Sequence, residues 1–527
     1  MKPLLLFLLI FVPLAATAGV LFGAAARRTA LLSALLNLAI AISLPFLYHP
    51  PRDGAGPHFD FVGGFRVVPQ LDLKFLVGVD GLSIMMVLLA ASVAVAAFCV
   101  SPRVEHSERT YYACLLFIVA GLMGAFVSLD LFFFYAFHEL ALIPTFLLIG
   151  IWGHGDRQAA AWKITIYLAF GSFVLLLGLI GLYLLLPPGD RTFDIRELYA
   201  LAREGAIPGG SAQKWVFLLL LLGFGTLISL FPFHTWAPTA YASAPTPAAM
   251  LHAGVLKKFG LYGLLRVAVP LLPDGARYWV TLLLFLLVGN IIYVGLVTIA
   301  QRRLDLMLGY SSVMHMGYIF LGIASLNSVG LSGAALVMFA HGLSIALLFA
   351  IAGEIRQRTG TMRLDELGGL ARTMPFLAVI FGFAMFASIG LPGFANFAGE
   401  VMVFFGAFGS AGSHFHRFDR YQIATVFALW GVVISAVYML RAYRRVFQGG
   451  PSLTAVTERV MTGAPGLSSD ESRLAEVPAL GEGSTIAFDL RWSLILLVAG
   501  LLFVGFYPQR LLDMIAPSLP SSLIQHP

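Results

Sequence analysis

Residues 214–268, KWVFLLLLLGFGTLISLFPFHTWAPTAYASAPTPAAMLHAGVLKKFGLYGLLRVA, decide what kind of protein this chain forms. An apolar run is interrupted by four prolines between positions 232 and 247, and a second apolar run then carries the adjacent Lys257 and Lys258. Each proline lacks a backbone donor and blocks the helix behind it, and an unpaired backbone group in hydrocarbon costs several kcal/mol. An interrupted helix beside a buried cation therefore indicates an ion or substrate path through a membrane protein.

The composition also predicts an all-α polytopic membrane protein. Hydrophobic residues make up 59% of the 527 residues and charged residues only 11%, which leaves too much apolar surface for one or two soluble domains. The net charge of +6 is spread over short loops, so it predicts membrane topology and no binding of nucleic acid. Cys99 and Cys114 lie in apolar runs without ligand spacing, so we expect no disulfide, metal or iron–sulfur site.

The apolar runs predict about fourteen membrane crossings. We expect them at residues 3–22, 30–48, 80–101, 110–128, 131–152, 160–187, 214–236, 242–268, 276–300, 306–325, 329–355, around 390–393 in an interrupted form, 421–440 and 492–508. The polar stretches 49–79, 188–213 and 447–488 are expected to be solvated loops, the last of them flexible. Most basic residues fall in loops on one side of these crossings, which the positive-inside rule assigns to the cytoplasm.

Glu139 stands near the centre of the fifth predicted crossing, LFFFYAFHELALIPTFLLIGIW (131–152). A charge at the bilayer midplane costs about 2.5–3.5 kcal/mol, so this carboxyl group needs a partner, a proton or water. Either it is a neutral acid that hydrogen-bonds a neighbouring helix, or it is a proton-carrying site, and its depth favours the second interpretation. His138 points about 100° away around the helix, so we interpret it as a hydrogen-bonding residue at a helix interface.

Three further ionisable residues lie in later apolar runs. His315 and His341 fall on consecutive predicted crossings, and a neutral imidazole is cheap to bury and can relay a proton through its two nitrogens. Glu400 follows the Gly390-Leu391-Pro392-Gly393 interruption in ASIGLPGFANFAGEVMVFFGAF (387–408). We therefore expect His315 and His341 to take part in a proton relay.

The two interruptions, near residues 232 and 392, occupy corresponding places in two halves of the chain. This placement predicts an internal repeat of about five crossings, and it divides the chain into four parts. They are an N-terminal part (1–109), a first repeat (110–268), a second repeat (276–446) and a C-terminal part with a polar loop and the last helix (447–527).

Seven stretches of the chain resemble a known family. They are FLVGVDGLSIMMVLL (75–89), FHELALIPTFLLIGIWG (137–153), FPFHTWAPTAYASAPT (231–246), AGVLKKFGLYGLLR (253–266), GYSSVMHMGYIFLGI (309–323), LPGFANFAGEVMVFFGAF (391–408) and FYPQRLLDM (506–514). These stretches are similar to the antiporter-like membrane subunits of bacterial respiratory complex I, the NADH:quinone oxidoreductase, and among them to subunit M, the counterpart of mitochondrial chain 4. Subunits L and N and the Mrp-type antiporters belong to the same family.

The resemblance implies about fourteen transmembrane helices in two inverted five-helix repeats, with the seventh and twelfth helices broken. It also implies that protons are transferred along a hydrated polar axis. The matching positions are Glu139, Lys258, His315, His341 and Glu400, with His138, His234, His252 and Lys257 as possible auxiliary residues. One position departs from the family pattern, because Leu227 stands where the seventh helix usually carries a lysine that pairs with the fifth-helix glutamate.

The resemblance further implies a multi-pass protein of the bacterial inner membrane that couples quinone reduction to proton translocation. We expect no cofactor in this chain, whereas FMN, iron–sulfur clusters and quinone are expected in partner subunits. The expected partners are the L-, N- and K-like membrane subunits. Two alternatives stay open: an Mrp-type cation/proton antiporter without redox coupling, and a scaffold subunit that no longer pumps, which Leu227 suggests.

Overall fold

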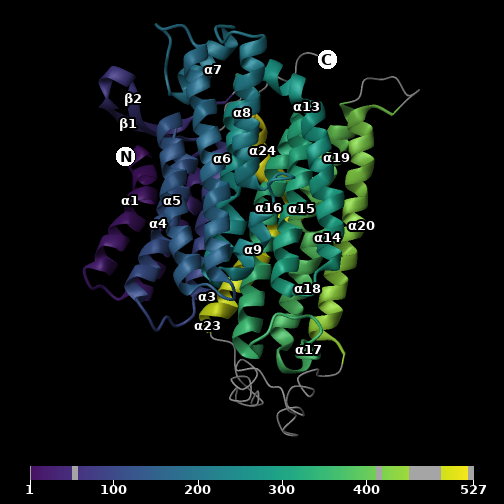
Figure 1. Cartoon of the computed structure of the whole chain (residues 1–527). Helices are drawn as coiled ribbons and strands as arrows, with labels where there is room; N and C mark the ends of the chain where they lie inside the picture. Colours follow the sequence, from purple (N-terminus) through teal and green to yellow (C-terminus); the bar gives the residue numbers. More distant parts are fainter. Residues whose placement is uncertain (1, 50–56, 411–417, 450–487, 520–527) are drawn as a thin grey trace.

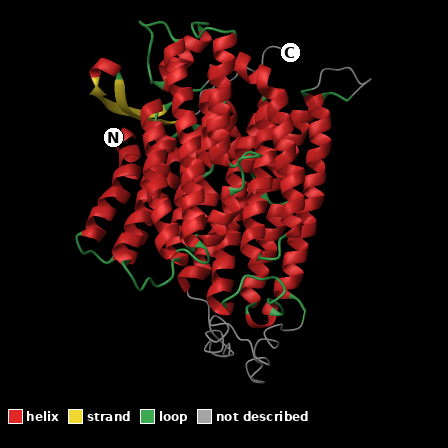
Figure 2. Cartoon of the chain, viewed as in Figure 1, coloured by secondary structure: helices red, strands yellow, loops and turns green. Residues whose placement is uncertain are grey.

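Upright helices make up nearly the whole protein and stand side by side in one bundle (Figure 1, Figure 2). This computed structural model describes residues 2–49, 57–410, 418–449 and 488–519. Within these residues, twelve helices are long and apolar enough to cross a membrane. A segmented eighth crossing and a pair of short apolar helices around Pro392 add two more, so the predicted architecture of about fourteen crossings is confirmed.

The elements follow one another in the predicted order. The chain begins with α1 (Lys2–Leu21), α2 (Ala26–Leu47), β1 (Asp60–Val68), β2 (Leu73–Val79), α3 (Gly81–Val100) and α4 (Glu108–Val127). Then come α5 (Leu131–Trp152), α6 (Arg157–Leu185), α7 (Ile195–Arg203), α8 (Ser211–Ile228), α9 (Trp236–Ser243), α10 (Thr246–Leu251), α11 (Lys258–Gly263) and α12 (Val269–Leu271).

The second half of the bundle begins at Pro273. It comprises α13 (Pro273–Val288), α14 (Val294–Ala300), α15 (Leu304–Ala324), α16 (Ser328–Thr359), α17 (Leu370–Thr373), α18 (Pro375–Ile389), α19 (Ala395–Gly409), α20 (Arg420–Phe447), α23 (Phe488–Phe506) and α24 (Pro508–Ile515). The side of the bundle that carries α17 is called the basic side below, and the opposite side, with β1, β2 and α7, is called the hairpin side (Figure 1). The expected flexible loop falls on residues 450–487, outside the described residues.

The prediction of a solvated loop over residues 49–79 is wrong for its second half. Strands β1 and β2 form an antiparallel hairpin in which Phe65 pairs with Phe75 and Arg66 with Lys74. Most of β2 is buried, because Phe75 packs against aromatic rings of α1 and α5, including Phe7 and Phe133. The run LKFLVGV has enough apolar area to leave water as a strand.

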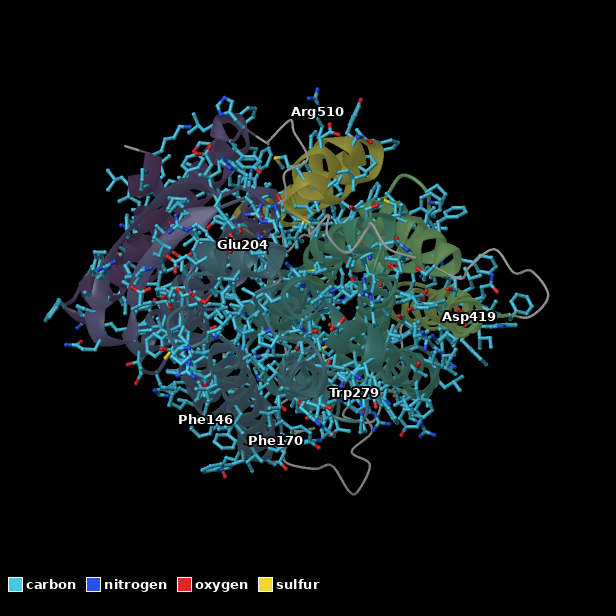
Figure 3. All side chains as sticks on the ribbon, turned by 90° about the horizontal axis from the view of Figure 1, so that it is seen from above. Phe146, Phe170, Glu204, Trp279, Asp419 and Arg510 are labelled. Carbon is cyan, nitrogen blue, oxygen red and sulfur yellow. The ribbon has the colours of Figure 1, made fainter. Side chains whose placement is uncertain are left out.

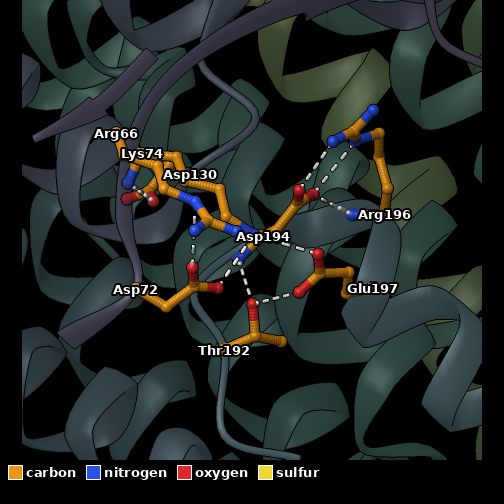
Figure 4. A network of polar contacts seen from close by, with 8 residues as sticks. All are labelled: Arg66, Asp72, Lys74, Asp130, Thr192, Asp194, Arg196 and Glu197. Carbon is orange, nitrogen blue, oxygen red and sulfur yellow. Dashed lines mark hydrogen bonds and ion pairs between the residues drawn. The ribbon is translucent and has the colours of Figure 1, made fainter. Parts of the chain in front are cut away.

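The stretch 188–213 is also more ordered than the prediction of a solvated loop. It contains α7, and the carboxylate of Asp194 is fully buried, where it caps that helix. A polar network joins α7 to the hairpin and to the start of α5 (Figure 4). Its members are Arg66, Asp72, Lys74, Asp130, Thr192, Asp194, Arg196 and Glu197.

Lys74 and Asp130 are the central contacts of this network. The Lys74 ammonium lies 2.8 Å from Asp72 and 3.0 Å from Glu197, and the Lys74 backbone N–H donates to Asp130 at 3.1 Å. Asp130 also caps α5 by accepting from the N–H of Phe132 at 2.9 Å. The network therefore fixes the start of the helix that carries Glu139.

The break in the seventh crossing lies between α8 and α9. The backbone turns at Ser229, whose φ is 74°, and the freed backbone groups are met by the buried side chain of Asn290. Asn290 accepts from the Phe231 N–H at 2.7 Å and donates to the Ser229 carbonyl at 3.1 Å. Its amide also donates to the Val313 carbonyl at 3.0 Å. One amide thus satisfies a break that would be untenable in lipid.

The break in the twelfth crossing lies between α18 and α19 and depends on glycine. Gly390 and Gly393 have φ values of 79° and 93°, a region that other residues rarely adopt. A side chain at Gly390 would also collide with the carboxyl group of Glu400. The interruption therefore brings the chain directly against this buried acid.

The eighth crossing is segmented without a break. Two π-helical turns, His252–Leu256 and Leu264–Ala268, interrupt its α-helical pieces. Such turns insert one residue into a helix and are frequent at functional sites. In this protein the first π-turn ends directly before Lys257 and Lys258.

A buried ion pair fastens the eighth crossing to α3. Arg266, 1% exposed, donates to Asp80, 0% exposed, at 2.5 Å, and the guanidinium lies 5.0 Å from the Phe59 ring centroid. Asp80 also caps α3 through the Ser83 N–H at 3.0 Å. The pair thereby ties together two helices that are distant in the sequence.

We predict that Asp80→Ala destabilises the protein by about 3–5 kcal/mol, because it leaves a buried guanidinium without its counter-charge. The expected result is a clear fall in the melting temperature of the detergent-solubilised protein. The double variant Asp80→Leu with Arg266→Met should recover part of the loss, since it removes both charges. Arg363→Ala, in a pair whose side chains are 53% and 54% exposed, is the control and should change little. Equal melting temperatures for Asp80→Ala and wild type would contradict the prediction.

Candidate functional site

Glu139 lies on the lateral face of the bundle and only partly inside it. Its side chain is 35% exposed and borders a cavity of about 250 Å³ between α5 and α6. Apolar side chains line this cavity, among them Phe146 and Leu168. In the view along the helices, Phe146 and Phe170 stand at the outer edge of the same face (Figure 3). A carboxyl group in this position needs a further polar partner once the face is in a membrane.

His138 lies at a helix interface, as expected, and it also lies close to Glu139. Its ring stacks on Phe259 of the eighth crossing, with centroids 4.1 Å apart, as an interface residue would. Its Nδ1 also lies 3.5 Å from a Glu139 carboxylate oxygen, although the two atoms are not aligned for a hydrogen bond. His138 therefore leads from the lateral face to the interior.

His252 continues this direction into the bundle. It is 4% exposed, and neither ring nitrogen has a protein partner. The ring is surrounded by Trp236 and Tyr241, and it interacts electrostatically with His138 and Lys257. Because buried polar atoms in proteins are nearly always hydrogen-bonded, the two nitrogens indicate positions for bound water.

His234 lies in the break of the seventh crossing itself. Its ring is 4% exposed, packs on Phe231 and Tyr293, and leaves Nδ1 without a protein partner. It interacts electrostatically with Lys257. His234 therefore lies beside the series of residues that begins with Glu139.

Lys258 makes the most direct contact among the predicted site residues. Its Nζ lies 3.0 Å from Nδ1 of His341 on α16 and donates to the Ala253 carbonyl at 2.5 Å. The ammonium is fully buried. A proton can therefore pass between Lys258 and His341 with no intervening group.

His315 extends the contact from His341 into α15. The two imidazole centroids lie 5.4 Å apart. Both nitrogens of His315 face carbonyl oxygens, those of Ser311 and Ser388, each at 2.8 Å. A neutral imidazole has one N–H and a protonated imidazole has two, so only the protonated ring satisfies both acceptors.

Glu400 ends the series next to the break in the twelfth crossing. It is 3% exposed, and one of its oxygens has no protein partner, like both polar atoms of the Asn396 side chain one turn earlier. Tyr318 lies between this acid and His315, since its ring is 5.6 Å from His315 and it interacts electrostatically with Glu400. The unpaired atoms again indicate water.

Lys257, named above as a possible auxiliary residue, is buried and contacts neighbouring side chains. It is 1% exposed, its Nζ is 3.4 Å from the Ser312 hydroxyl, and it lies 5.5 Å from the Tyr241 ring centroid. The two segments of the eighth crossing on either side of Lys257, His252–Leu256 and Lys258–Gly263, are buried throughout, so its amine does not reach the protein surface.

Leu227, which stands where the family usually has a lysine, makes an apolar contact between α8 and α6. It is 3% exposed on the last turn of α8 and packs on Gly171 of α6. Ser172, the next residue, lies beside Glu139. A lysine at position 227 would therefore stand close to Glu139.

The fold thus gathers one series of residues, called the polar row below, from α5 through the eighth crossing, α16 and α15 to the second break. Its members are Glu139, His138, His252, Lys257, Lys258, His341, His315 and Glu400. Asn290, Asn396 and Tyr318 belong to this environment but were not predicted. A single asparagine in an apolar helix was the available signal for the first two. Within the described residues, no group of three or more His, Cys, Asp or Glu side chains could hold a metal ion.

The fold and the polar row define a polytopic, antiporter-like membrane protein. A family model described as NADH:quinone oxidoreductase/Mrp antiporter, transmembrane, matches residues 128–418. The chain belongs to this family.

Known relatives and solved structures agree with this assignment. The chain is 36% identical to NAD(P)H-quinone oxidoreductase chain 4 2 of Microcystis aeruginosa, over 90% of this chain and 84% of the relative. It is also 36% identical to NADH-quinone oxidoreductase subunit M of Rickettsia conorii, over 75% and 77% of the two chains.

Among solved structures, a chain of respiratory complex I from Thermus thermophilus matches with a TM-score of 0.79 and 26% identity, over 100% of both chains. A chain of the Mrp complex from Dietzia has a TM-score of 0.78, covering 99% of this chain and 98% of that one, but its 20% identity shows a shared fold alone.

The basic side holds a cavity of about 940 Å³. Five arginines line it: Arg103, Arg157, Arg303, Arg356 and Arg363. His154, between α5 and α6, lines this cavity and a second one, and its backbone N–H donates to the Ser243 carbonyl at 2.7 Å. Burial, reinforced by the positive charge of Arg356, lowers the pKa of His154 to about 4.

We predict that His154 makes the protein less stable in mild acid. Its pKa is 6.5 when exposed and about 4 in the folded protein, so between these values the unfolded chain binds a proton that the folded chain does not. Stability is therefore complete above 6.5 and falls as the pH is lowered through this window. Thermal melting in detergent should show this fall, and His154→Gln should make it shallower. Identical pH profiles for the two proteins would exclude the assignment.

Proposed function

We propose that this chain translocates protons as a membrane subunit of a NADH:quinone oxidoreductase, with the polar row as the proton path. The observation that carries the proposal is the contact of 3.0 Å between Lys258 and His341, which continues to His315 and the break beside Glu400. The quinone-reductase relatives at 36% identity favour this assembly over a stand-alone transporter.

Protons move along the row by sequential loading and release. Charge interactions are strong in a low-dielectric interior, so a change of charge at one member biases the proton occupancy of the next. Lys258 can exchange a proton because burial disfavours its charged form. Quinone reduction elsewhere in the assembly supplies the initial change of charge or conformation.

Electron transfer belongs to the partner subunits in this proposal, and FMN, iron–sulfur clusters and quinone are assigned to them. Glu139, with 35% of its side chain exposed on an apolar face, supports a membrane partner that covers this face. We assign the L-, N- and K-like subunits as neighbours. The protein is a multi-pass protein of the bacterial inner membrane.

Purification of the intact assembly from native membranes distinguishes the redox proposal from its main alternative. We expect quinone-reductase and iron–sulfur subunits to co-purify with this chain, identified by mass spectrometry. Co-purification with small antiporter subunits alone would support an Mrp-type cation/proton antiporter.

We predict that Lys258→Ala and Glu400→Gln each lower proton translocation and the coupled quinone reduction in the assembled complex. The loss should be roughly two orders of magnitude, typical for removal of a proton-transfer group. Measurement uses membrane vesicles with NADH and an added quinone, with a pH-sensitive dye for protons. Unchanged rates in both variants, with normal assembly, would falsify the relay assignment.

Leu227→Lys tests the third possibility, a scaffold that does not pump. An ammonium at this position would lie near Glu139 and pair with it. We expect the wild-type complex to pump already, so the variant should not raise the number of protons moved per electron. A clear rise in that ratio would instead mean that the natural chain is the scaffold.

A further inference from the structure

Two lysines that follow one another in the sequence are both buried in the centre of this bundle, and they point to different partners. Lys257 is 1% and Lys258 0% exposed, and they are the lysines with buried side chains among the described residues. Consecutive residues of a helix point about 100° apart. Their amines accordingly contact different parts of the protein.

Lys257 lies between α9 in the first half of the chain and the middle of α15 in the second. Its Nζ lies 5.5 Å from the ring of Tyr241 in α9 and 3.4 Å from the hydroxyl of Ser312. It also interacts electrostatically with His234 and His252, which both have ring nitrogens without a protein partner, and with His315 and His341. Of the two lysines, Lys257 is the one that interacts more strongly with His252.

Lys258 faces the second half. Its Nζ is 3.0 Å from His341, and His341 lies next to His315. The π-turn His252–Leu256 directly before the two lysines adds a residue to the helix turn, and the enclosing helices keep both amines away from solvent. The two halves of the row therefore meet at this pair of amines.

Two neighbouring ammonium groups in a low-dielectric interior repel each other strongly, and each is costly to bury. The pair has few contacts that would compensate a second positive charge, because the Lys257 amine contacts only the Ser312 hydroxyl and the face of the Tyr241 ring. A single proton on the pair avoids the repulsion and leaves the other amine neutral. The vacant amine is then ready to accept the next proton.

We infer that Lys257 and Lys258 form a two-position proton carrier, in which Lys257 receives a proton from the His252 side and passes it to Lys258. This inference rests on the proposed function and adds Lys257 as a second proton-transferring residue. In the step, an N–H bond of the Lys257 ammonium breaks and leaves an amine, while the Lys258 amine forms an N–H bond and becomes an ammonium. The pair keeps one proton and one positive charge throughout.

The test compares Lys257→Met and Lys257→Arg in the assembled complex. Methionine keeps the apolar stem but removes the amine, whereas arginine keeps a fixed positive charge that does not release its proton. We expect both variants to lose proton translocation to the level of Lys258→Met, measured as the initial rate of proton uptake in NADH-driven vesicles. Lys214→Met is the matched control, because that lysine stands at the helix end beside the Tyr278 ring, and it should pump normally.

The outcomes separate the inference from the proposed function. Normal pumping by Lys257→Arg would assign Lys257 a structural charge, and normal pumping by Lys257→Met would give it no role; either result overturns the inference. If Lys258→Met loses proton translocation in the same experiment, the proposed function stands although the inference does not. If Lys258→Met also pumps normally, the inference and the proposed function are both contradicted.

A titratable replacement provides a second measurement that does not depend on loss of activity. Lys257→His restores a group that binds and releases protons, so it should recover pumping that Lys257→Met and Lys257→Arg lack. Because the imidazole releases its proton at lower pH than an amine does, the recovered activity should have its optimum at lower pH than wild type. Pumping by the histidine variant no better than by the methionine variant, with normal assembly, contradicts the inference.

Discussion

The structure depends on one constraint: every polar atom placed inside an apolar helix bundle needs a partner. Lys258 meets this requirement with the Ala253 carbonyl and His341, and Arg266 meets it with Asp80. Elsewhere along the polar row the requirement is unmet by protein atoms, as at His252 and Glu400. Unpaired atoms at these positions, on residues whose neighbours can exchange protons, are consistent with a path that holds water.

The two helix breaks satisfy the same constraint in different ways. At the first break, the single amide of Asn290 binds backbone groups on both sides of the interruption and also reaches α15. At the second break, Gly390 and Gly393 permit a backbone path that other residues resist, and Gly390 leaves room for Glu400. A polar side chain thus stabilises the first break, whereas the second break requires glycines, which have no side chain. Both breaks bring backbone next to ionisable groups.

The two ends of the polar row differ in their surroundings. Glu400 is enclosed, whereas Glu139 is partly exposed on a face that also carries exposed aromatic and aliphatic side chains. Leu227 leaves Glu139 without a cation from α8, so its partner comes from His138 or from another subunit. The first site is therefore open at the lateral face, while this chain alone encloses the second.

The sequence by itself determined the membrane architecture, both interruptions and most members of the polar row, because long apolar runs, prolines and ionisable residues in apolar surroundings are local signals. It misassigned the hairpin at 60–79 and the buried Asp194 to solvated loops. Only the tertiary structure decided that Lys258 touches His341 and that Asn290 closes the first break, since these contacts join residues far apart in the chain. Local patterns report which groups must be buried, but the packing of helices determines which partner each buried group meets.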